Sequence, residues 1–512
     1  MDYQEFVDAE KSLLVAPAGY GKTFTIAECL KHTTGKQLVL THTHAGIAAI
    51  KEKIKKTPEI KLSQCCIETI SSFAQRYVKA FYVGENMPSQ ERSKDYHKFV
   101  VEQATRIFGT SPVKNVLEAS YSGLFVDEYQ DCNIDQHRMI AAISNVLPTH
   151  ILGDYLQGIF DFEGGAALVD FDIDLNAFED FHTLETPHRW YQEGNNRPLG
   201  DHLKTIRELL EGRQDIVLEA NNGIGFHVLE VNAADVRDSE SAYRKWLRRL
   251  IENPDDDPSL ESLLIIVPEY KETDKNGNVI PKGAISSRAS LKRQIDFGNR
   301  LSLLEAIDAK SFYSIAKTAD LLVGSISRAQ KPIKKCKEFL SKIFNITDIN
   351  DWISGTRNSH GDDYLINKTN IIQKNKSEKF QEHLTDFIEN PSVSLLKIVI
   401  GLTKSELKCK FKREEVLYSL MNALEQAILC GTSVNDAMME QRNRIRRYGR
   451  KVKGKCLGTT LLTKGLEFDT VVILDAHNFD CPKHLYVAIT RACKKLVIFT
   501  ENTTLSPYKD AN

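Results

Sequence analysis

Residues 16–23 form a glycine-containing stretch whose side chains and spacing suit the binding of a phosphate chain. The stretch comprises Ala16, Pro17, Ala18, Gly19, Tyr20, Gly21, Lys22 and Thr23. It meets the pattern GxxxxGK[ST], except that Ala16 stands in place of the first glycine. Backbone N–H groups of such a loop surround phosphates at the positive end of the following helix, while Lys22 reaches the β- and γ-phosphates and Thr23 binds Mg²⁺. A plain glycine turn is the alternative interpretation.

Two adjacent acids further along the chain have the chemistry that such a site needs. They lie in LFVDEYQD, where an apolar run ends at Asp127 and Glu128. If the run is a strand, both acids lie at its carboxyl end, where open α/β sheets bind ligands. Asp127 would hold Mg²⁺, and Glu128 would orient and deprotonate the attacking water. A solvated acidic turn would explain the two acids but not the YQD that follows them.

The elements that must position these residues are short apolar runs separated by amphipathic stretches, a pattern typical of buried parallel strands alternating with helices. The runs are SLLVA (12–16), QLVLT (37–41), GLFVD (123–127), HILGD (150–154), LLIIVP (263–268), TVVILD (470–475) and KLVIFT (495–500). Residues 309–447 instead carry apolar residues three and four apart, as in EEVLYSLMNALEQAILCG, which predicts helices. We therefore expect an α/β protein with parallel sheets and an inserted helical region.

Length and composition limit the class of protein. With 512 residues the chain should form two or more domains. Its 67 Lys and Arg against 69 Asp and Glu give a net charge of −2, so any contact with nucleic acid must be local. The ten cysteines show no metal-type spacing, and no apolar run approaches the length of about 18 residues that a membrane span needs. We expect a cytoplasmic protein with no membrane partner.

The phosphate loop together with VDEYQD resembles the superfamily 1A helicases, the UvrD, Rep and PcrA group. Further segments resemble that family's motifs and follow in its order: QLVLTHTHAGIAAIKEKI, ETISSFA, ILGDYLQGIFDFEGG, LETPHRW, TTLLTKGLEFDTVVIL and LYVAITRACKKLVIF. The resemblance implies a P-loop NTPase with two RecA-like lobes. The first lobe would comprise residues 1–73 and 121–180, with a short helical insertion at 74–120. The second would comprise 181–308 and 448–512, with a helical insertion at 309–447.

The resemblance also implies which residues contact the base and the ribose. Gln4 matches the glutamine that reads adenine, because its amide can both donate and accept hydrogen bonds. Phe24 follows the phosphate loop directly, and His188 stands where the family stacks a tyrosine on the base. Glu467 matches the acid that reaches the ribose. A solvent-exposed Gln4 and a strand-capping Glu467 are the alternatives.

Two further pairs are implied at the γ-phosphate. Asp154 and Gln157 would sense the γ-phosphate and couple it to DNA. Arg189 and Arg491 would act as arginine fingers from the second lobe, since a guanidinium is planar and always charged. A surface ion pair is the alternative for either arginine.

The DNA contacts implied by the resemblance are Thr43, His44, Thr69, Ser71 and Phe162. Hydroxyls would hold phosphates, and the ring of Phe162 would stack on a base. The chain departs from the family pattern mainly on this side: His44, Glu163, Pro187, His188 and Leu461 stand in place of Asn, Arg, Asn, Tyr and His. We expect ATP hydrolysis to be intact and nucleotide selectivity to be loosened. The substitutions on the DNA side are compatible both with unwinding of duplex DNA and with its loss.

A basic segment precedes the last DNA motif. Residues 442–455, RNRIRRYGRKVKGK, carry eight Lys and Arg around one tyrosine. The segment is either a track for DNA or a solvated helix face that docks an acidic partner.

The leading functional prediction is a DNA-dependent ATPase, with ATP as substrate and Mg²⁺ as cofactor, that moves three-prime to five-prime on single-stranded DNA. The alternative is a hydrolase activated by DNA ends, with little unwinding, that works with a nuclease partner. The helicase-like subunits of Gabija-type anti-phage systems resemble this chain in size, and their partner would be an OLD-like nuclease of the TOPRIM type. A non-enzymatic binding module would require a broken phosphate site, which Lys22, Glu128 and Arg491 argue against.

Overall fold

The computed structural model describes residues 1–88, 93–160, 166–192, 194–232, 238, 240–273, 277–296, 300–306, 309–354, 365–366, 370–448, 452 and 454–508. The chain forms two compact units, one made of Met1–Leu301 with Arg447–Asn512 and the other of Ser302–Arg446. Phe162 and Glu163, two residues of interest on the DNA side, lie outside the described residues. Within the described part, no helix has both the length and the apolar character needed to cross a membrane.

The first unit begins with a six-stranded parallel sheet, the first lobe. Its strand order is β3-β2-β4-β5-β1-β6. The strands are β1 (Lys11–Val15), β2 (Gln37–Thr41), β3 (Cys65–Thr69), β4 (Gly123–Val126), β5 (Thr149–Gly153) and β6 (Glu179–Thr183). Four of the predicted apolar runs are therefore strands, and they are central because parallel strands must be buried on both faces.

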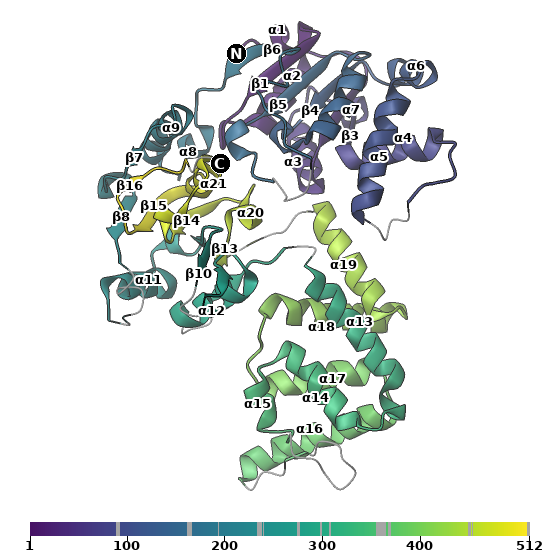
Figure 1. Ribbon diagram of the computed structural model, residues 1–512, viewed down its shortest axis with the longest axis vertical. Helices are drawn as coiled ribbons and strands as arrows, with labels where there is room; N and C mark the ends of the chain where they lie inside the picture. Colours follow the sequence, from purple (N-terminus) through teal and green to yellow (C-terminus); the bar gives the residue numbers. More distant parts are fainter. Residues whose placement is uncertain are drawn as a thin grey trace. The chain divides into compact units, whose positions relative to one another are not determined.

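Helices cover both faces of this sheet (Figure 1). They are α1 (Tyr3–Asp8), α2 (Lys22–Lys31), α3 (His44–Lys55), α4 (Ile70–Phe81), α5 (Ser93–Phe108), α6 (Ser111–Ser120) and α7 (Ile134–Ser144). Neighbouring strand residues enter different cores: Leu13 packs with Phe73 of α4, whereas Leu14 packs with Ile26 of α2. This alternation follows from the two-residue period of a strand, so the sheet is the middle of three layers.

A second parallel sheet, the second lobe, completes the first unit. Its order is β12-β13-β9-β14-β15-β8, and its strands are β8 (Phe226–Glu230), β9 (Leu263–Ile266), β12 (Leu301–Leu303, where the first unit's long segment ends), β13 (Lys455–Gly458), β14 (Phe468–Ile473) and β15 (Ala492–Thr500). Teal β8 and yellow β15 lie side by side in Figure 1 although more than 200 residues separate them. The second lobe is thus built from two distant segments of the chain.

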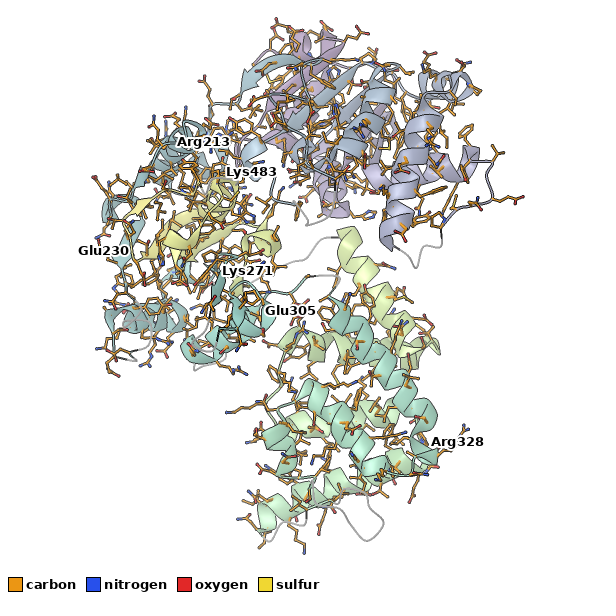
Figure 2. All side chains as sticks on the ribbon, viewed as in Figure 1. Arg213, Glu230, Lys271, Glu305, Arg328 and Lys483 are labelled. Carbon is orange, nitrogen blue, oxygen red and sulfur yellow. The ribbon has the colours of Figure 1, made fainter. Side chains whose placement is uncertain are left out.

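The remaining elements of this lobe are short. Its helices are α8 (His188–Tyr191), α9 (Arg197–Glu211), α11 (Ala242–Glu252), α12 (Ile285–Ile295), α20 (Thr460–Thr463) and α21 (Pro482–Ile489). Two antiparallel pairs join β10 (Lys271–Thr273) to β11 (Val279–Pro281) and β7 (Ile216–Val217) to β16 (Thr504–Leu505). Figure 2 labels Lys483 at the start of α21 and Arg213 just beyond α9, both on this lobe.

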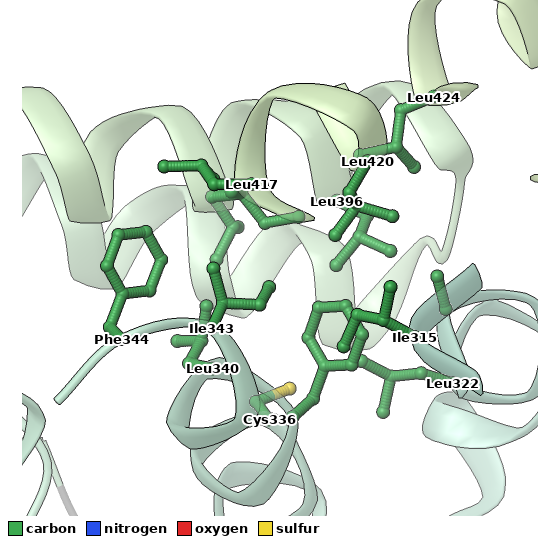
Figure 3. Packing of buried hydrophobic residues seen from close by; sticks show 14 of the residues in the cluster. Ile315, Leu322, Cys336, Leu340, Ile343, Phe344, Leu396, Leu417, Leu420 and Leu424 are labelled. Carbon is green, nitrogen blue, oxygen red and sulfur yellow. The ribbon is translucent and has the colours of Figure 1, made fainter. Parts of the chain in front are cut away.

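The second unit is helical. It contains α13 (Lys310–Ser325), α14 (Pro332–Ile343), α15 (Ile346–Asn350), α16 (Ile371–Glu389), α17 (Val393–Ser405), α18 (Glu414–Cys430) and most of α19 (Val434–Tyr448). Its core joins residues of α13, α14, α17 and α18, among them Ile315, Leu340, Leu396 and Leu420 (Figure 3). Helix α18 ends at Cys430 and is capped by Gly431 in the left-handed conformation. An ion pair between Glu305, labelled in Figure 2, and Arg413 also lies in this unit.

The structure corrects part of the interpretation of the basic segment. Arg442 is fully buried inside the helical unit, where its guanidinium lies 3.5 Å from the ring centre of Phe312 and pairs with Glu415 and Ser419. Arg442 therefore belongs to the core and cannot serve as an exposed contact for DNA. Arg444 is exposed, and the side chains of residues 446–451 and 453 lie outside the described part.

Candidate nucleotide-binding site

The phosphate loop follows β1 and leads directly into α2, as the sequence predicted. Gly19 and Gly21 have φ values of 81° and 94°, a conformation that side chains rarely adopt. Gly21 is the N-cap of α2, so Lys22 and Thr23 occupy the first turn of that helix. Ala16 is tolerated because it still belongs to the sheet: it is buried, and its N–H donates to the carbonyl of Gly153 at 2.7 Å.

Lys22 meets the two adjacent acids. Its ammonium lies 2.6 Å from Glu128 Oε2 and 3.6 Å from Asp127 Oδ1. Burial raises the pKa of Asp127 to about 6. Burial also opposes the ionisation of Glu128, but the positive charges of Lys22 and Lys464 outweigh it and lower the pKa of Glu128 to about 2. The site therefore holds Glu128 as a carboxylate, the form that accepts a proton.

Backbone geometry aims Glu128 away from the strand. Its φ of 57° is left-handed, which is uncommon for a residue other than glycine, Asn or Asp. The side chain of Gln130 holds Glu128 in this orientation. Its Nε2 donates to Glu128 Oε2, and its Oε1 accepts from the N–H of Asp154 at 2.9 Å. Sequence reasoning did not assign Gln130 a role, although it belongs to the VDEYQD segment. Gln130 links the acid pair to the end of β5.

Asp154 and Gln157 lie next to the phosphate loop. Asp154 is fully buried, and its Oδ2 accepts hydrogen bonds from the N–H of Ala18 at 3.1 Å and from Gln157 Nε2 at 2.8 Å. Gln157 Oε1 lies 3.4 Å from Arg491 Nη2, which belongs to the second lobe. The structure thus brings both residues of ILGDYLQG to the contact between the phosphate loop and the second lobe.

The two candidate arginine fingers also lie at the contact between the phosphate loop and the second lobe. The backbone N–H of Arg189 donates to Gly19 at 2.8 Å, and its side chain pairs with Glu467 at 2.7 Å and donates to the carbonyl of Thr490 at 2.6 Å. Arg491 is buried, and burial together with the nearby charge of Arg189 lowers its pKa to about 10. The two guanidiniums repel each other, so a further negatively charged group beside them would be stabilised.

Lys464 was not assigned from the sequence, although it lies in the KGLEF segment. Its ammonium donates to Asp131 at 2.5 Å and to the carbonyl of Gln157 at 2.6 Å, and it lies 4.6 Å from the ring centre of Phe160. Asp131 is the last residue of VDEYQD. A cation of the second lobe therefore binds two motifs of the first lobe beside the acid pair.

Two residues predicted to contact the nucleotide lie at different distances from the loop. His188 is close, since a Cβ built on Gly21 would lie 3.4 Å from His188 Cδ2. Gln4 is exposed and bonds to Asp8 and to His32, at the far end of α2. Since α2 has ten residues, that end lies about 15 Å along the helix from Lys22. The structure therefore does not bring Gln4 to the phosphate loop.

The remaining predicted contacts lie at helix starts. Phe24 is 42% exposed, with the ammonium of Lys53 at 4.5 Å from its ring centre. Thr43 caps α3 by accepting from Gly46, and Thr69 is buried and caps α4 by accepting from Ser72, each at 3.0 Å. Ser71 is exposed and His44 is half-buried. The two threonine hydroxyls thus act as helix N-caps, a role that the sequence analysis did not predict.

Comparison with known families agrees with this geometry. A model of an AAA domain matches residues 3–163, and a model of the viral superfamily 1 RNA helicase core domain matches residues 366–500. These matches, together with the curated relatives, support a superfamily 1 helicase family for the chain.

Curated relatives of the chain include two Lactococcus lactis proteins. An ATP-dependent helicase/nuclease component from subspecies lactis is 26% identical over 219 residues, which cover 41% of this chain and 18% of the relative. The exonuclease/helicase component RexA from subspecies cremoris is 26% identical over 170 residues, covering 32% of this chain and 14% of the relative. The chain therefore matches less than a fifth of the length of these relatives.

Solved superfamily structures resemble the chain distantly. A Pif1 helicase from Bacteroides is 9% identical, with 96% of this chain and 90% of that chain covered and a TM-score of 0.33. An Arterivirus nonstructural protein 10 helicase is 15% identical, with 52% and 49% covered and a TM-score of 0.25. Likenesses this low carry no conclusion about function.

Mg²⁺ fits the acid pair of this site by one observation. Asp127 Oδ1 is buried, and no hydrogen bond from a described residue reaches it. A carboxylate oxygen of this kind beside a helix start that offers the Thr23 hydroxyl is a suitable ligand set for a hard cation. Asp127 and Thr23 are the residues that would hold the ion.

Proposed function

We propose that this chain is a nucleic-acid-dependent ATPase that acts as a UvrD-like translocase, moving three-prime to five-prime on single-stranded DNA in the cytoplasm. One observation carries the proposal: Lys22, Asp127 and Glu128 of the first lobe share a site with Arg189 and Arg491, which the second lobe anchors. Phosphoryl transfer needs positioned cations, a metal-binding acid and a base for water, and this set supplies all three.

The chain's own residues have distinct parts in the reaction. Lys22 and the loop amides hold the β- and γ-phosphates, and Glu128 takes the proton of the water that attacks the γ-phosphorus. The bond between that phosphorus and the β-phosphate oxygen breaks, while Arg189 and Arg491 stabilise the charge that develops. Mg²⁺ on Asp127 and Thr23 would supply further charge neutralisation at the phosphates.

The contacts between lobes support a coupling of hydrolysis to movement. Arg491 contacts Gln157, and Lys464 contacts Asp131. The VAITRA and KGLEF segments of the second lobe therefore each contact a motif of the first lobe. A γ-phosphate that enters among these side chains would change which contacts form, and its loss would let them return. Repeated closing and opening of the lobes would move a bound strand in steps.

Substitutions on the DNA side favour a second candidate function. Leu461 and His188 replace polar and aromatic residues of the family pattern, and the Thr69 hydroxyl is occupied as a helix cap. A chain that senses DNA ends and hydrolyses ATP without separating strands would keep the phosphate site and lose part of the DNA track. Such a chain would work with a nuclease partner, in anti-phage defence if it is Gabija-like.

One experiment separates the two functions. ATP turnover is measured with single-stranded DNA and with blunt duplex, and strand separation is measured on duplexes that carry a three-prime or a five-prime tail. The translocase proposal expects stimulation by single strands and separation of the three-prime-tailed duplex alone. Stimulation without any separation supports the sensor, and no stimulation by any nucleic acid overturns both.

A further inference from the structure

A buried arginine of the second lobe reaches a buried carboxylate of the first, and the family motifs do not include it. Arg207 lies in α9 and is 3% exposed. Its Nη1 donates to Asp154 Oδ1 at 2.9 Å, and its Nε lies 2.7 Å from Glu211 Oε1. The Asp154 carboxylate is completely buried, so Arg207 is the partner that balances its charge.

Aromatic rings of both lobes flank the guanidinium of Arg207. The ring centre of Tyr155, from the first lobe, lies at 5.4 Å, and that of Tyr486, in α21, lies at 4.9 Å. Burial opposes the charge of Arg207, but Asp154, Tyr486 and Glu211 outweigh it and raise its pKa above the ordinary arginine value. The guanidinium is therefore fixed in position and permanently charged.

The far side of the same carboxylate holds the phosphate loop. Asp154 Oδ2 accepts from the N–H of Ala18, and the hydroxyl of Tyr486 accepts from the same N–H at 3.3 Å. Asp154 Oδ2 also holds Gln157, whose Oε1 faces Arg491. A continuous chain of hydrogen bonds thus runs from Arg207 through Asp154 to the backbone of the loop that precedes Lys22.

We propose that Arg207 is a positioning residue for ATP hydrolysis: from the second lobe it fixes the Asp154 carboxylate that anchors the phosphate loop at Ala18. The inference rests on the proposed ATPase function and adds a residue through which the second lobe sets the geometry of the loop. Without Arg207, the buried carboxylate would lose the charge that balances it, and the Ala18 anchor would change. Small displacements of bound reactants slow reactions strongly.

The test compares Arg207→Met with Arg197→Met. Both arginines lie on α9, but Arg197 is exposed and packs on the ring of Tyr191. We expect kcat for ATP at saturating single-stranded DNA to fall about tenfold or more in Arg207→Met, at a temperature where melting curves show it folded. Arg197→Met stays within twofold of wild type, and Arg207→Lys recovers part of the loss because it restores the charge.

A double variant shows whether Arg207 acts through Asp154. In the Asp154→Asn background, where no buried charge is left to balance, adding Arg207→Met changes kcat by less than twofold. Multiplicative losses in the double variant, or an unchanged kcat in Arg207→Met, overturn the inference. If Arg207→Met does not fold, Arg207→Lys and the uncharged double variant decide by the same criteria. A wild-type protein without ATP turnover would instead overturn the proposed function.

Discussion

The backbone N–H of Arg189 donates to the carbonyl of Gly19 at 2.8 Å, which joins the candidate arginine finger to the middle of the phosphate loop. The contact leaves no room for a side chain at Gly19. A Cβ on Gly19 would lie 2.8 Å from Arg189 Cβ and 2.9 Å from Trp190 Cζ3. Trp190 is itself fixed, since it is buried and donates to the carbonyl of Ala492 at 2.7 Å.

Gly19→Ala should therefore cost more than backbone strain. Gly194 has a similar positive φ of 84° but open space around it, so Gly194→Ala measures the strain alone, about 1–2 kcal/mol. We expect Gly19→Ala to lower the free energy of unfolding further and to abolish binding of a fluorescent ATP analogue. Equal effects of the two substitutions on stability and binding would show that the close packing of α8 on the loop is not needed.

The pair formed by Lys464 and Asp131 should behave as a buried ion pair. Both side chains are less than a tenth exposed. Removing one partner, as in Asp131→Asn or Lys464→Met, should cost about 3–5 kcal/mol in the free energy of unfolding, because the remaining charge is buried alone. The double variant should be more stable than the less stable single variant. Additive losses in denaturant titrations would contradict this account.

Arg442 should matter for stability rather than for DNA. Arg442→Ala leaves Glu415 and the face of Phe312 without their cation inside the helical unit, and we expect a loss of about 3–5 kcal/mol. Arg444→Ala, at an exposed position of the same helix, should change stability by no more than about 0.5 kcal/mol. A folded Arg442→Ala protein with unchanged stability and weakened DNA binding would restore the interpretation of Arg442 as a DNA contact.

His150 should make the protein sensitive to acid. It is buried between Phe6 and Phe125, bonds to Ser12 at 2.7 Å, and burial lowers its pKa to about 4. The unfolded chain takes up the proton near pH 6.5, so the free energy of unfolding falls by about 3 kcal/mol as the pH drops from about 6.5 to about 4.

The double variant Ser12→Ala/His150→Phe removes this titration while keeping a ring in place. It should lose about 3 kcal/mol less than wild type over the same pH range in denaturant titrations. His97→Gln, at an exposed position, serves as the control and should follow wild type. Parallel curves for wild type and the double variant would show that His150 does not titrate in this range.

Much of the sheet architecture could be predicted because central parallel strands are continuous apolar runs. The strands that sequence reasoning missed are of a different kind. β3 reads CCIET and β6 reads EDFHT. Both are edge strands of the first sheet, with a neighbouring strand on one side only, and polar residues are tolerated there. β13 reads KCLG, too short a run to stand out. The hydrophobic pattern thus revealed most central strands of each sheet and missed the edge strands and the short inner strand β13.

The site divides in the same way. Lys22, Asp127 and Glu128 could be predicted because each lies in a short segment whose spacing alone implies its chemistry. Arg207 could not, since its meaning depends on Asp154, 53 positions away. Lys464 gains its role from Asp131, 333 positions away, and only the folded chain brings them together. Local motifs specify the reacting groups, whereas the residues that position them emerge from tertiary structure.

The central claim is that Glu128 is the base of a nucleic-acid-stimulated ATPase. The most direct measurement is steady-state ATP turnover at saturating single-stranded DNA for wild type, Glu128→Gln and Glu118→Gln, the last an exposed glutamate of the same lobe. We predict stimulated turnover in wild type and Glu118→Gln, and a loss of about a hundredfold or more in Glu128→Gln with nucleotide binding retained. Near-wild-type turnover in Glu128→Gln would contradict the account.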